Sequence, residues 1–457
     1  MKAFLKITAL LCAVMTLLPF AACTGKPADT TAESTQKQET EATTAAETAA
    51  GEETTKAVTA EETTAELTDA ETAEPTEKTA PVENVQSWTF DDGVAGKVIG
   101  VYCETEPYAE VTFRDLSGAV VLRERAIDKY FYGRFVVPDD QPTHTVYIYA
   151  QSEGKKISDP SRPVTLRFSD NVGSGAFIGR DSHVYLSWYR DFYDGQQGIP
   201  GASDGERKTY MLGIKKYLHA QLDEVRRHTG KNTKIIILVC TNPATIYHGL
   251  QYPLEEGGVG DKLEPTSTTQ MAEFLSDDED IYMLDMRDIL LQHTDKLLFM
   301  QADSHWTQIS AYYGYYLCAQ KIKQDFPDTK VYDLEKDFET EIVPSGGDLL
   351  NFMGIGGMTL ACTATVTANS SDMDAKDGAP TAYVMGDSYY NALREFLPLM
   401  FSKIYLNNPP SNPPLYDYTL EDLESKKPDY LFYVWTERNI NGGLGMITSS
   451  ISAANIK

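Results

Sequence analysis

Cysteine is scarce in this chain, with six residues among 457 and no C-x-x-C pair. Cys12 lies in the apolar N-terminal stretch, and Cys23 directly follows it. The rest of the chain holds four more, Cys103, Cys240, Cys318 and Cys362. Their irregular spacing predicts neither a disulfide framework nor a structural zinc site, and it leaves their oxidation state open. A folded region of roughly 370 residues does not need disulfides for stability, and we expect no metal or other cofactor.

Positive charge is also in short supply. Lys and Arg number 40 against 67 Asp and Glu, which gives a formal net charge of −27. Binding to nucleic acid requires a basic face, so we do not expect nucleic acid as a partner. The acidity fits solubility outside the cell and says little about the substrate.

The N-terminal apolar stretch, residues 7–20, is shorter than the ~20 residues that a membrane-spanning helix needs. Lys2 and Lys6 precede it, and two alanines and Cys23 follow, which is typical of a secretory signal. We expect residues 1–22 to be a signal peptide. The Ala-Ala-Cys sequence resembles the lipobox of bacterial lipoproteins, which implies a lipid on Cys23. The mature protein is then anchored outside the cell membrane of a bacterium, for which we expect a Gram-positive one. The alternative is plain secretion after cleavage nearby.

Residues 24–85 contain no aromatic residue and few branched apolar ones. Thr, Ala and Glu dominate this segment. Such a composition cannot bury enough surface to offset the entropy of ordering. We therefore expect residues 23–85 to form a disordered linker.

Residues 86–170 alternate apolar and polar positions with period two. The strand-like segments are 98–102, 110–113, 131–137 and 145–150, separated by turn residues. This spacing predicts a small all-β sandwich of immunoglobulin-like type. Two roles are open for it: a spacer, or a carbohydrate-binding module that uses its many tyrosines.

Residues 171–457 alternate helical and strand-like patterns. Residues 207–229 have apolar positions at helical spacing, and further helices are expected at 307–325 and 389–402. The short apolar runs are 235–240, 281–286, 297–300, 383–385 and 430–435. Unbroken apolar runs are typical of parallel strands buried on both faces, so the pattern predicts an α/β doubly wound sheet. Ligands of such sheets bind beyond the carboxyl ends of the strands.

Two short motifs lie where such a site is expected. The first is Asp303-Ser304-His305-Trp306, and the second is Gly386-Asp387-Ser388-Tyr389, which follows an apolar run. A serine is a weak nucleophile unless a base lies beside it. On an extended stretch Asp303 and His305 would share one face, so the carboxylate can orient the imidazole that deprotonates Ser388. Backbone N–H groups after the strand can bind an oxyanion.

These motifs resemble the SGNH-hydrolase-like domain of the alginate O-acetyltransferases AlgX and AlgJ and of the Gram-positive DHHW proteins. Further matches are Gly179-Arg180-Asp181, Pro243, Ile246-Tyr247, Gly347-Asp348-Leu349 and Glu437-Arg438. The resemblance covers about residues 174–445. It implies a flavodoxin-like α/β/α fold in which Ser388 is the nucleophile, His305 the base and Asp303 its orienting acid. The implied chemistry is transfer of acetyl groups to or from a cell-envelope or exported polysaccharide, with a membrane acyl exporter as the partner that supplies the donor.

Other residues near the motifs have weaker assignments. The candidates for oxyanion or substrate contacts are Asn242, Asp387, Trp306 and Tyr389. Trp306 and Tyr389 are equally well explained as core aromatics. Ser388 without its partner residues would be better explained as a helix N-cap. A second Asp-Ser-His sequence at residues 181–183 is an alternative dyad, although its flanks read as a turn entering a strand. A metal site at Asp303, His305 and Asp387 is a further alternative.

Two classes of function follow. The first is an extracytoplasmic serine acyltransferase or carbohydrate esterase. The second is a catalytically silent SGNH-like lipoprotein that binds glycan or assists assembly. A complete set of Asp, His and Ser favours the first, because a silent domain has no physical need for all three. The sequence leaves transfer and hydrolysis open, since they differ only in whether a sugar hydroxyl or water attacks the acyl-enzyme.

Overall fold

The computed structural model divides the chain into two units, Met1–Glu71 and Thr72–Lys457. The described residues all lie in the second unit: 75–92, 96–136, 143–168, 173–187, 199, 201, 203–250, 265–357, 359–375, 378–406 and 420–440. The predicted signal peptide, the lipidation site Cys23 and most of the predicted linker lie outside them. No helix in these ranges has the length and apolarity needed to cross a membrane.

The first part of the fold is a sandwich of two four-stranded sheets. The first sheet has the order β5-β2-β1-β8 and the second β4-β3-β6-β7. The strands are β1 (Glu83–Asp91), β2 (Lys97–Glu104), β3 (Glu110–Asp115), β4 (Val120–Arg125), β5 (Tyr130–Phe135), β6 (Thr143–Gln151), β7 (Val164–Arg167) and β8 (Gly173–Ser174). Apolar side chains from both sheets, such as Val101 and Ile148, form one core between them. The all-β prediction for this region is confirmed.

The last residues of the predicted linker (residues 23–85) are part of the folded sandwich. The Thr79 N–H donates to the Lys156 carbonyl, 2.9 Å away, and Thr79 and Val82 are buried. β1 then begins at Glu83. Any shortened protein that keeps the sandwich intact must therefore begin before Thr79.

The β5-β2-β1-β8 sheet is buried on its second face as well. Tyr102, Tyr130 and Tyr132 belong to the same apolar cluster as the core of the α/β part. The Gln301 amide, two residues before Asp303, donates to the Tyr130 carbonyl at 2.9 Å. Burial on both faces explains why β5 is an almost unbroken aromatic run, YFYGRF. These three tyrosines are consequently unavailable for stacking on a sugar.

The second part is built on a five-stranded parallel sheet of order β12-β11-β17-β15-β16. Its strands are β11 (Lys234–Cys240), β12 (Ile281–Asp285), β15 (Thr381–Gly386), β16 (Lys403–Leu406) and β17 (Tyr430–Thr436). Parallel strands need crossover connections, and helices supply most of them. The predicted α/β fold with a parallel sheet is confirmed.

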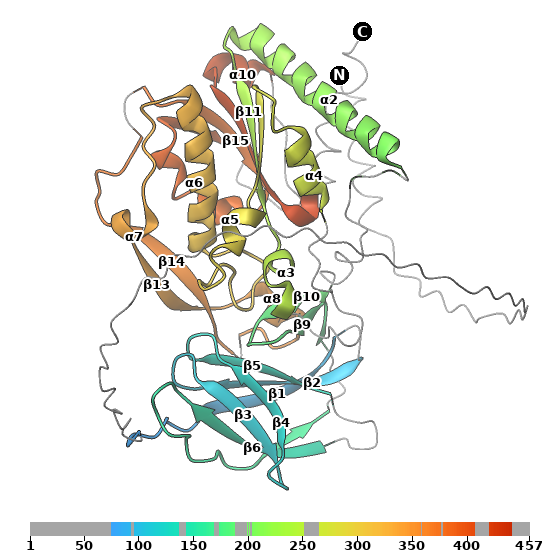
Figure 1. The fold of residues 1–457 in the computed structure, drawn as a ribbon, viewed down its shortest axis with the longest axis vertical. Coiled ribbons are helices and arrows are strands. Elements are labelled where there is room, and N and C mark those ends of the chain that lie inside the picture. The colour runs from blue at the N-terminus through green and yellow to red at the C-terminus, as the bar shows by residue number, and fades with distance from the viewer. Residues whose placement is uncertain are drawn as a thin grey trace, which may run out of the picture. The chain divides into compact units, whose positions relative to one another are not determined.

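Helices cover both faces of this sheet (Figure 1). Ile236 and Leu238 of β11 pack into the cluster that contains α6, whereas Ile235 and Ile237 pack into the cluster that contains α2 and α4. The alternation follows from the period of two along a strand. The helical segments are α2 (Asp204–Thr229), α3 (Pro243–Ile246), η2 (His248–Leu250), α4 (Ser267–Phe274), α5 (Arg287–Leu291), α6 (Gln308–Asp325), α7 (Leu334–Asp337), α8 (Asp348–Phe352), α9 (Tyr390–Leu393), η4 (Leu397–Leu399), α10 (Leu420–Lys426) and η5 (Glu437–Asn439).

Two antiparallel ribbons accompany the sheet. One pairs β9 (Ala176–Ile178) with β10 (Val184–Leu186), and the other pairs β13 (Phe338–Ser345) with β14 (Ala361–Ala368). The second ribbon flanks α8, whose first residue is Asp348. α8 therefore lies between β13 and β14 in the sequence.

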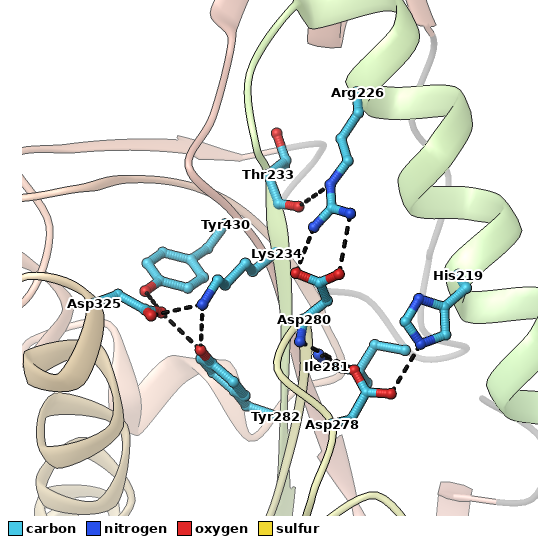
Figure 2. A network of polar contacts seen from close by, with 10 residues as sticks. All are labelled: His219, Arg226, Thr233, Lys234, Asp278, Asp280, Ile281, Tyr282, Asp325 and Tyr430. Atoms are coloured by element: carbon cyan, nitrogen blue, oxygen red, sulfur yellow. Dashed lines mark hydrogen bonds and ion pairs between the residues drawn. The ribbon is translucent and has the colours of Figure 1, made fainter.

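Ion pairs gather at the amino ends of the parallel strands (Figure 2). Lys234, the first residue of β11, contacts Asp325 at 2.6 Å, and the Tyr430 hydroxyl donates to the same carboxylate at 2.7 Å. Arg226 of α2 pairs with Asp280 at 2.7 Å. These contacts connect α2 and α6 to the amino ends of the strands, which lie opposite to the two motifs.

Two predicted elements differ in the structure. Residues 297–300 were expected to form a strand, but they make only an isolated bridge, Phe299 with Trp306, because their backbone pairs with the residues that follow His305. The helix expected at 389–402 is broken into α9 and η4. Pro398 has no N–H for a helical hydrogen bond, so a continuous helix cannot pass through it.

Candidate active site

Ser388 lies in the turn that follows β15, at the carboxyl end of the parallel sheet. Gly386 ends β15, and a Cβ atom at this position would lie 2.7 Å from the Val434 carbonyl oxygen of β17. Glycine thus permits the close approach of β15 to β17 just before the turn. Ser388 itself is partly exposed, and its N–H has no acceptor among the residues that the structure describes. Both its hydroxyl and its N–H can therefore meet a substrate.

The Asp387 carboxylate anchors this turn through hydrogen bonds. Its Oδ2 accepts hydrogen bonds from the Thr436 N–H at 2.8 Å, the Thr436 hydroxyl at 2.6 Å and the Asn439 amide at 3.1 Å. Its Oδ1 accepts from the Tyr389 N–H at 3.0 Å. The side chain is buried and acts only as an acceptor. Asp387 is therefore an anchor of the Ser388 turn and cannot donate to an oxyanion.

His305 bridges Asp303 and Ser388. Its Nδ1 lies 2.6 Å from Asp303 Oδ1, and its Nε2 lies 2.7 Å from Ser388 Oγ. The expected extended stretch is wrong: residues 301–305 form a bend, and the His305 N–H also donates to Asp303 Oδ1 at 3.0 Å. The turn, rather than the face of a strand, brings the two side chains together. Hydrogen bonds thus connect all three residues of the predicted triad, in the order Asp303, His305, Ser388.

The Asp303 carboxylate is surrounded by donors on both oxygens. Burial alone would raise its pKa, but the His305 ring and the N–H groups of His305 and Asp348 together lower the pKa below the ordinary aspartate value. The Asp348 N–H donates to Oδ2 at 3.0 Å. A carboxylate held ionised in this way can orient an imidazole and stabilise its protonated form.

Trp306 and Tyr389 connect the two loops of the site. The Trp306 indole N–H donates to the Tyr389 carbonyl at 2.9 Å, and the Tyr389 hydroxyl donates to the Ser304 carbonyl at 2.6 Å. The Tyr389 ring lies 5.3 Å from the His305 ring, measured between centroids. Trp306 is 2% exposed and Tyr389 is 0% exposed. Their positions agree with the alternative reading as core aromatics, and neither is placed to contact substrate.

Arg438 lies beside the same pair of loops. Its guanidinium carbon is 5.2 Å from the centre of the Tyr389 ring, and its Nη1 is 3.4 Å from the Ser304 carbonyl oxygen. Glu437, by contrast, is buried and accepts from the Thr245 hydroxyl at 2.7 Å. Burial raises the pKa of Glu437. Among the side chains in these contacts, Arg438 is therefore the cation nearest to the triad.

Asn242 makes no hydrogen bond to Ser388 among the described residues. It directly precedes α3, and its N–H donates to Glu437 at 3.0 Å. It follows β11, which β17 separates from β15. The predicted oxyanion contact stays a prediction.

The second Asp-Ser-His sequence is a structural turn. Asp181 and Ser182 have positive φ angles of 48° and 61°, and β10 begins at Val184. The His183 ring contacts the backbone carbonyl of Asp181 at 3.0 Å rather than its carboxylate. Burial lowers the pKa of His183 to about 4. The Ser182 hydroxyl donates to the Arg125 carbonyl at 2.8 Å. This turn offers no serine-base pair.

A metal site at Asp303, His305 and Asp387 is the predicted alternative to the triad. Among the described residues, the group with ligand spacing is instead Asp303, His305 and Asp348, whose ligand atoms lie within 4.8 Å of one another. Every one of these groups already makes hydrogen bonds to a neighbour in the site. A hydrogen-bonded triad accounts for the cluster.

The sequence did not reveal the contacts of Ser304, Asp348 and Arg438. Asp348 is matched only through the family resemblance, and for Glu437-Arg438 an ion pair that closes the last strand is favoured over a contact of Arg438 with an acid near the site. The contacts of Asp348 and Arg438 with the motif span 44 and 134 positions, and no local pattern marks such pairings. A Gly-Asp pair preceding a short helix was the sole available signal.

No curated protein sequence matches the chain. Among solved structures, the O-acetyltransferase domain of Pseudomonas putida AlgJ matches at 15% identity over 60% of this chain and 99% of that one, with a TM-score of 0.38. Pseudomonas aeruginosa AlgX matches at 16% identity over 57% and 62%, with a TM-score of 0.39. A DHHW family protein from Eubacterium siraeum matches at 14% identity over 66% and 95%, with a TM-score of 0.38.

A family-level match includes the whole triad. Asp303, His305 and Ser388 all lie within one stretch of the chain that also carries Asp348. This stretch, residues 223–398, matches the family described as "SGNH hydrolase-like domain, acetyltransferase AlgX".

Proposed function

We propose that this chain is an extracytoplasmic serine enzyme that moves acetyl groups to or from a cell-envelope or exported polysaccharide. The observation that carries the proposal is the continuous hydrogen-bonded series from Asp303 through His305 to the partly exposed Ser388 hydroxyl, with distances of 2.6 and 2.7 Å. The family match of residues 223–398 to an acetyltransferase domain supports the acetyl group as the cargo.

The first half-reaction forms an acyl-serine. Ser388 Oγ attacks the carbonyl carbon of an acetyl ester, and its proton passes to His305 Nε2. Asp303 stabilises the resulting imidazolium through the Nδ1–H. The tetrahedral intermediate then collapses, the ester C–O bond breaks, and the leaving alcohol takes the proton from Nε2. The Ser388 N–H supplies one oxyanion donor.

The second half-reaction returns the enzyme to its starting state. A sugar hydroxyl or a water molecule gives its proton to His305 Nε2 and attacks the acetyl carbonyl on Ser388. Collapse releases Ser388 Oγ, which regains the proton. Attack by sugar yields an O-acetylated glycan, and attack by water yields acetate, so both outcomes use the same residues.

The setting is part of the proposal. The basic and apolar N-terminus that leads to Ala-Ala-Cys23 supports export and a lipid anchor on the cell membrane. The partners are then the polysaccharide substrate and a membrane acyl exporter that delivers the donor.

The test is turnover of a soluble acetyl ester with and without a sugar acceptor, following free acetate and acetylated sugar. Ser388→Ala and His305→Ala should each lose on the order of 10⁴-fold in kcat, and the double variant should be little worse, since triad residues act as a unit. Ser371→Ala and His228→Ala, an exposed serine after β14 and a histidine in the last turn of α2, serve as controls. Unchanged turnover in a folded Ser388→Ala protein would contradict the proposal.

A further inference from the structure

Three consecutive residues of the motif loop are bound by the start of α8. The Ala302 carbonyl accepts from the Leu349 N–H at 3.2 Å. The Asp303 carboxylate accepts from the Asp348 N–H at 3.0 Å. Ser304 donates to the Asp348 carboxylate twice, from its N–H to Oδ1 at 2.7 Å and from its hydroxyl to Oδ2 at 2.6 Å. The two segments are therefore joined in both directions.

Gly347 makes this approach possible. A Cβ atom at position 347 would lie 1.8 Å from the Ala302 carbonyl oxygen, which no side chain can satisfy. The backbone before α8 consequently lies directly against residue 302. Only this separation lets the Asp348 N–H reach the Asp303 carboxylate.

Ser304 transmits the same constraint toward Ser388. Its carbonyl accepts from the Tyr389 hydroxyl at 2.6 Å, and Tyr389 directly follows Ser388. Its N–H and hydroxyl are held by Asp348. Ser304 therefore lies between an anchor on α8 and the residue that adjoins Ser388, while its sequence neighbours are Asp303 and His305.

We propose that Asp348 is a positioning residue, which holds the Asp303 carboxylate and the Ser304 backbone so that the His305 ring stays aligned with Ser388. The inference rests on the proposed serine chemistry. Asp348 contacts neither the nucleophile nor the acyl group and acts through Asp303 and Ser304. Misplacement of a reacting group by about 1 Å costs on the order of 100-fold in rate, so a residue with this role leaves a large kinetic signature.

The Asp303–His305 hydrogen bond gives a second signature. His305 Nδ1 lies 2.6 Å from Asp303 Oδ1, and the other oxygen of Asp303 accepts from the Asp348 N–H at 3.0 Å. Loss of the Asp348 side-chain contacts should let the Ser304 backbone and the Asp303 carboxylate shift, so the proton on Nδ1 should report the change. A residue that only maintains the fold would leave the environment of that proton unchanged.

The test uses the full chain and hydrolysis of a soluble acetyl ester, from which kcat and KM are measured. The variants are Asp348→Asn, which keeps one acceptor and removes the charge, Asp348→Ala, which removes both bonds to Ser304, and Ser304→Ala, which removes one. Asp115→Asn is the matched control, because Asp115 also accepts from the N–H and hydroxyl of one serine, Ser117, but in the β-sandwich. Thermal unfolding of each variant and the downfield proton resonance of the His305 Nδ1–H provide readouts that need no turnover.

We expect Asp348→Asn and Asp348→Ala to lose about 10- to 100-fold in kcat with little change in KM. The Nδ1–H resonance should shift or broaden in both variants. Ser304→Ala should lose about 3- to 10-fold in kcat, and Asp115→Asn should match the wild type.

A folded Asp348→Asn protein with unchanged kcat and an unchanged Nδ1–H resonance would overturn the positioning role. If Asp348→Asn does not fold, Ser304→Ala decides: reduced kcat at an unchanged melting temperature supports the role, and unchanged kcat overturns it. A wild-type protein without esterase activity contradicts the proposed function instead, and the resonance alone then decides whether Asp348 holds the Asp303–His305 pair.

Discussion

Two aspartates flank the reacting hydroxyl and have opposite tasks. Asp303, 85 positions away in the sequence, reaches Ser388 through the His305 ring. Asp387, the immediate neighbour of Ser388, turns inward and accepts hydrogen bonds from Tyr389, Thr436 and Asn439. The acid that adjoins the nucleophile in sequence is therefore the structural one.

Replacing Asp387 tests this division. Asp387→Ala leaves the Thr436 N–H and hydroxyl without their buried acceptor, so we expect the free energy of unfolding to fall by about 3 kcal/mol. Urea denaturation measures the change. Thr436→Val removes one of the donors and should cost about 1 kcal/mol. An Asp387→Ala protein as stable as the wild type would show that these bonds contribute nothing.

The triad could be named from the sequence because its residue types stand in short, recognisable motifs. Asp303 and His305 are two positions apart, and Gly386 lies two positions before Ser388. The contacts that hold them could not be named. Asp348 reaches Ser304 across 44 positions, and nothing in either local sequence specifies that pairing.

At the scale of elements, the two ends of the parallel strands differ in purpose. Their carboxyl ends carry the triad, and their amino ends carry the ion pairs of Figure 2. Asp278, just before β12, is one of these groups. Its Oδ2 contacts Lys215 and His219 of α2, each at 2.8 Å, and its Oδ1 accepts from the Asp280 and Ile281 N–H groups. Asp278 thus couples α2 to the start of β12.

Asp278 predicts an acid-dependent loss of stability. Burial would raise the pKa of this carboxyl, but Lys215, His219 and the Asp280 N–H together lower it to about 2. A lowered pKa means stability that is fully present above the ordinary value of 3.8 and is lost as the pH falls toward about 2. The contribution is about 2 kcal/mol. Denaturation from pH 5 to pH 2 should show a shallower decline in Asp278→Asn than in Asp277→Asn, its exposed neighbour. Equal declines in the two variants would contradict the assignment.

The long, strongly patterned elements were predictable, and the short ones beside the site were not. The period of α2 and the apolar runs of β11 and β17 are set by burial on the sheet, which the sequence records directly. Residues 297–300 have the same apolar character as a strand, yet their backbone turns back on residues 305–307 to present Asp303 and His305. Local composition cannot distinguish these two pairings.

At the scale of the whole molecule, the β-sandwich and the α/β part share one apolar cluster. The period-two pattern predicted the sandwich but not what covers its second face. The clue in the sequence is the mostly aromatic run of β5. All six residues of this strand are buried in the structure. A sandwich with one solvated face would have alternated there.

Because of the shared core, we expect the α/β part to need the sandwich in order to stay folded. A protein beginning at Thr72 should be soluble and as active on a soluble ester as the full chain. One beginning at Gly173 exposes the apolar residues that pack against Tyr102, Tyr130 and Tyr132, so it should aggregate or unfold. Solubility, circular dichroism and ester turnover compare the two. An active, folded protein beginning at Gly173 would show that the two parts are independent.

The N-terminal segment predicts a tethered enzyme. Cys23→Ala should release the full-length protein from membranes, because the lipid is the expected anchor. We expect the linker to behave as the flexible coil that its composition predicts, so about 50 residues should span roughly 40 Å and set the reach of the enzyme from the membrane. Fractionation of cells that express each form measures the release. Retention of Cys23→Ala in the membrane fraction would point to another anchor.

The central claim, that the acyl group is carried on Ser388, is tested most directly by trapping the intermediate. The full chain is incubated with an activated acetyl ester, quenched in acid, digested and examined by mass spectrometry. The account predicts one added acetyl group on the peptide that contains Ser388, absent from Ser388→Ala and strongly reduced in His305→Ala. An acetyl group that accumulates with turnover on another residue, or turnover that persists in Ser388→Ala with no adduct on residue 388, would contradict it.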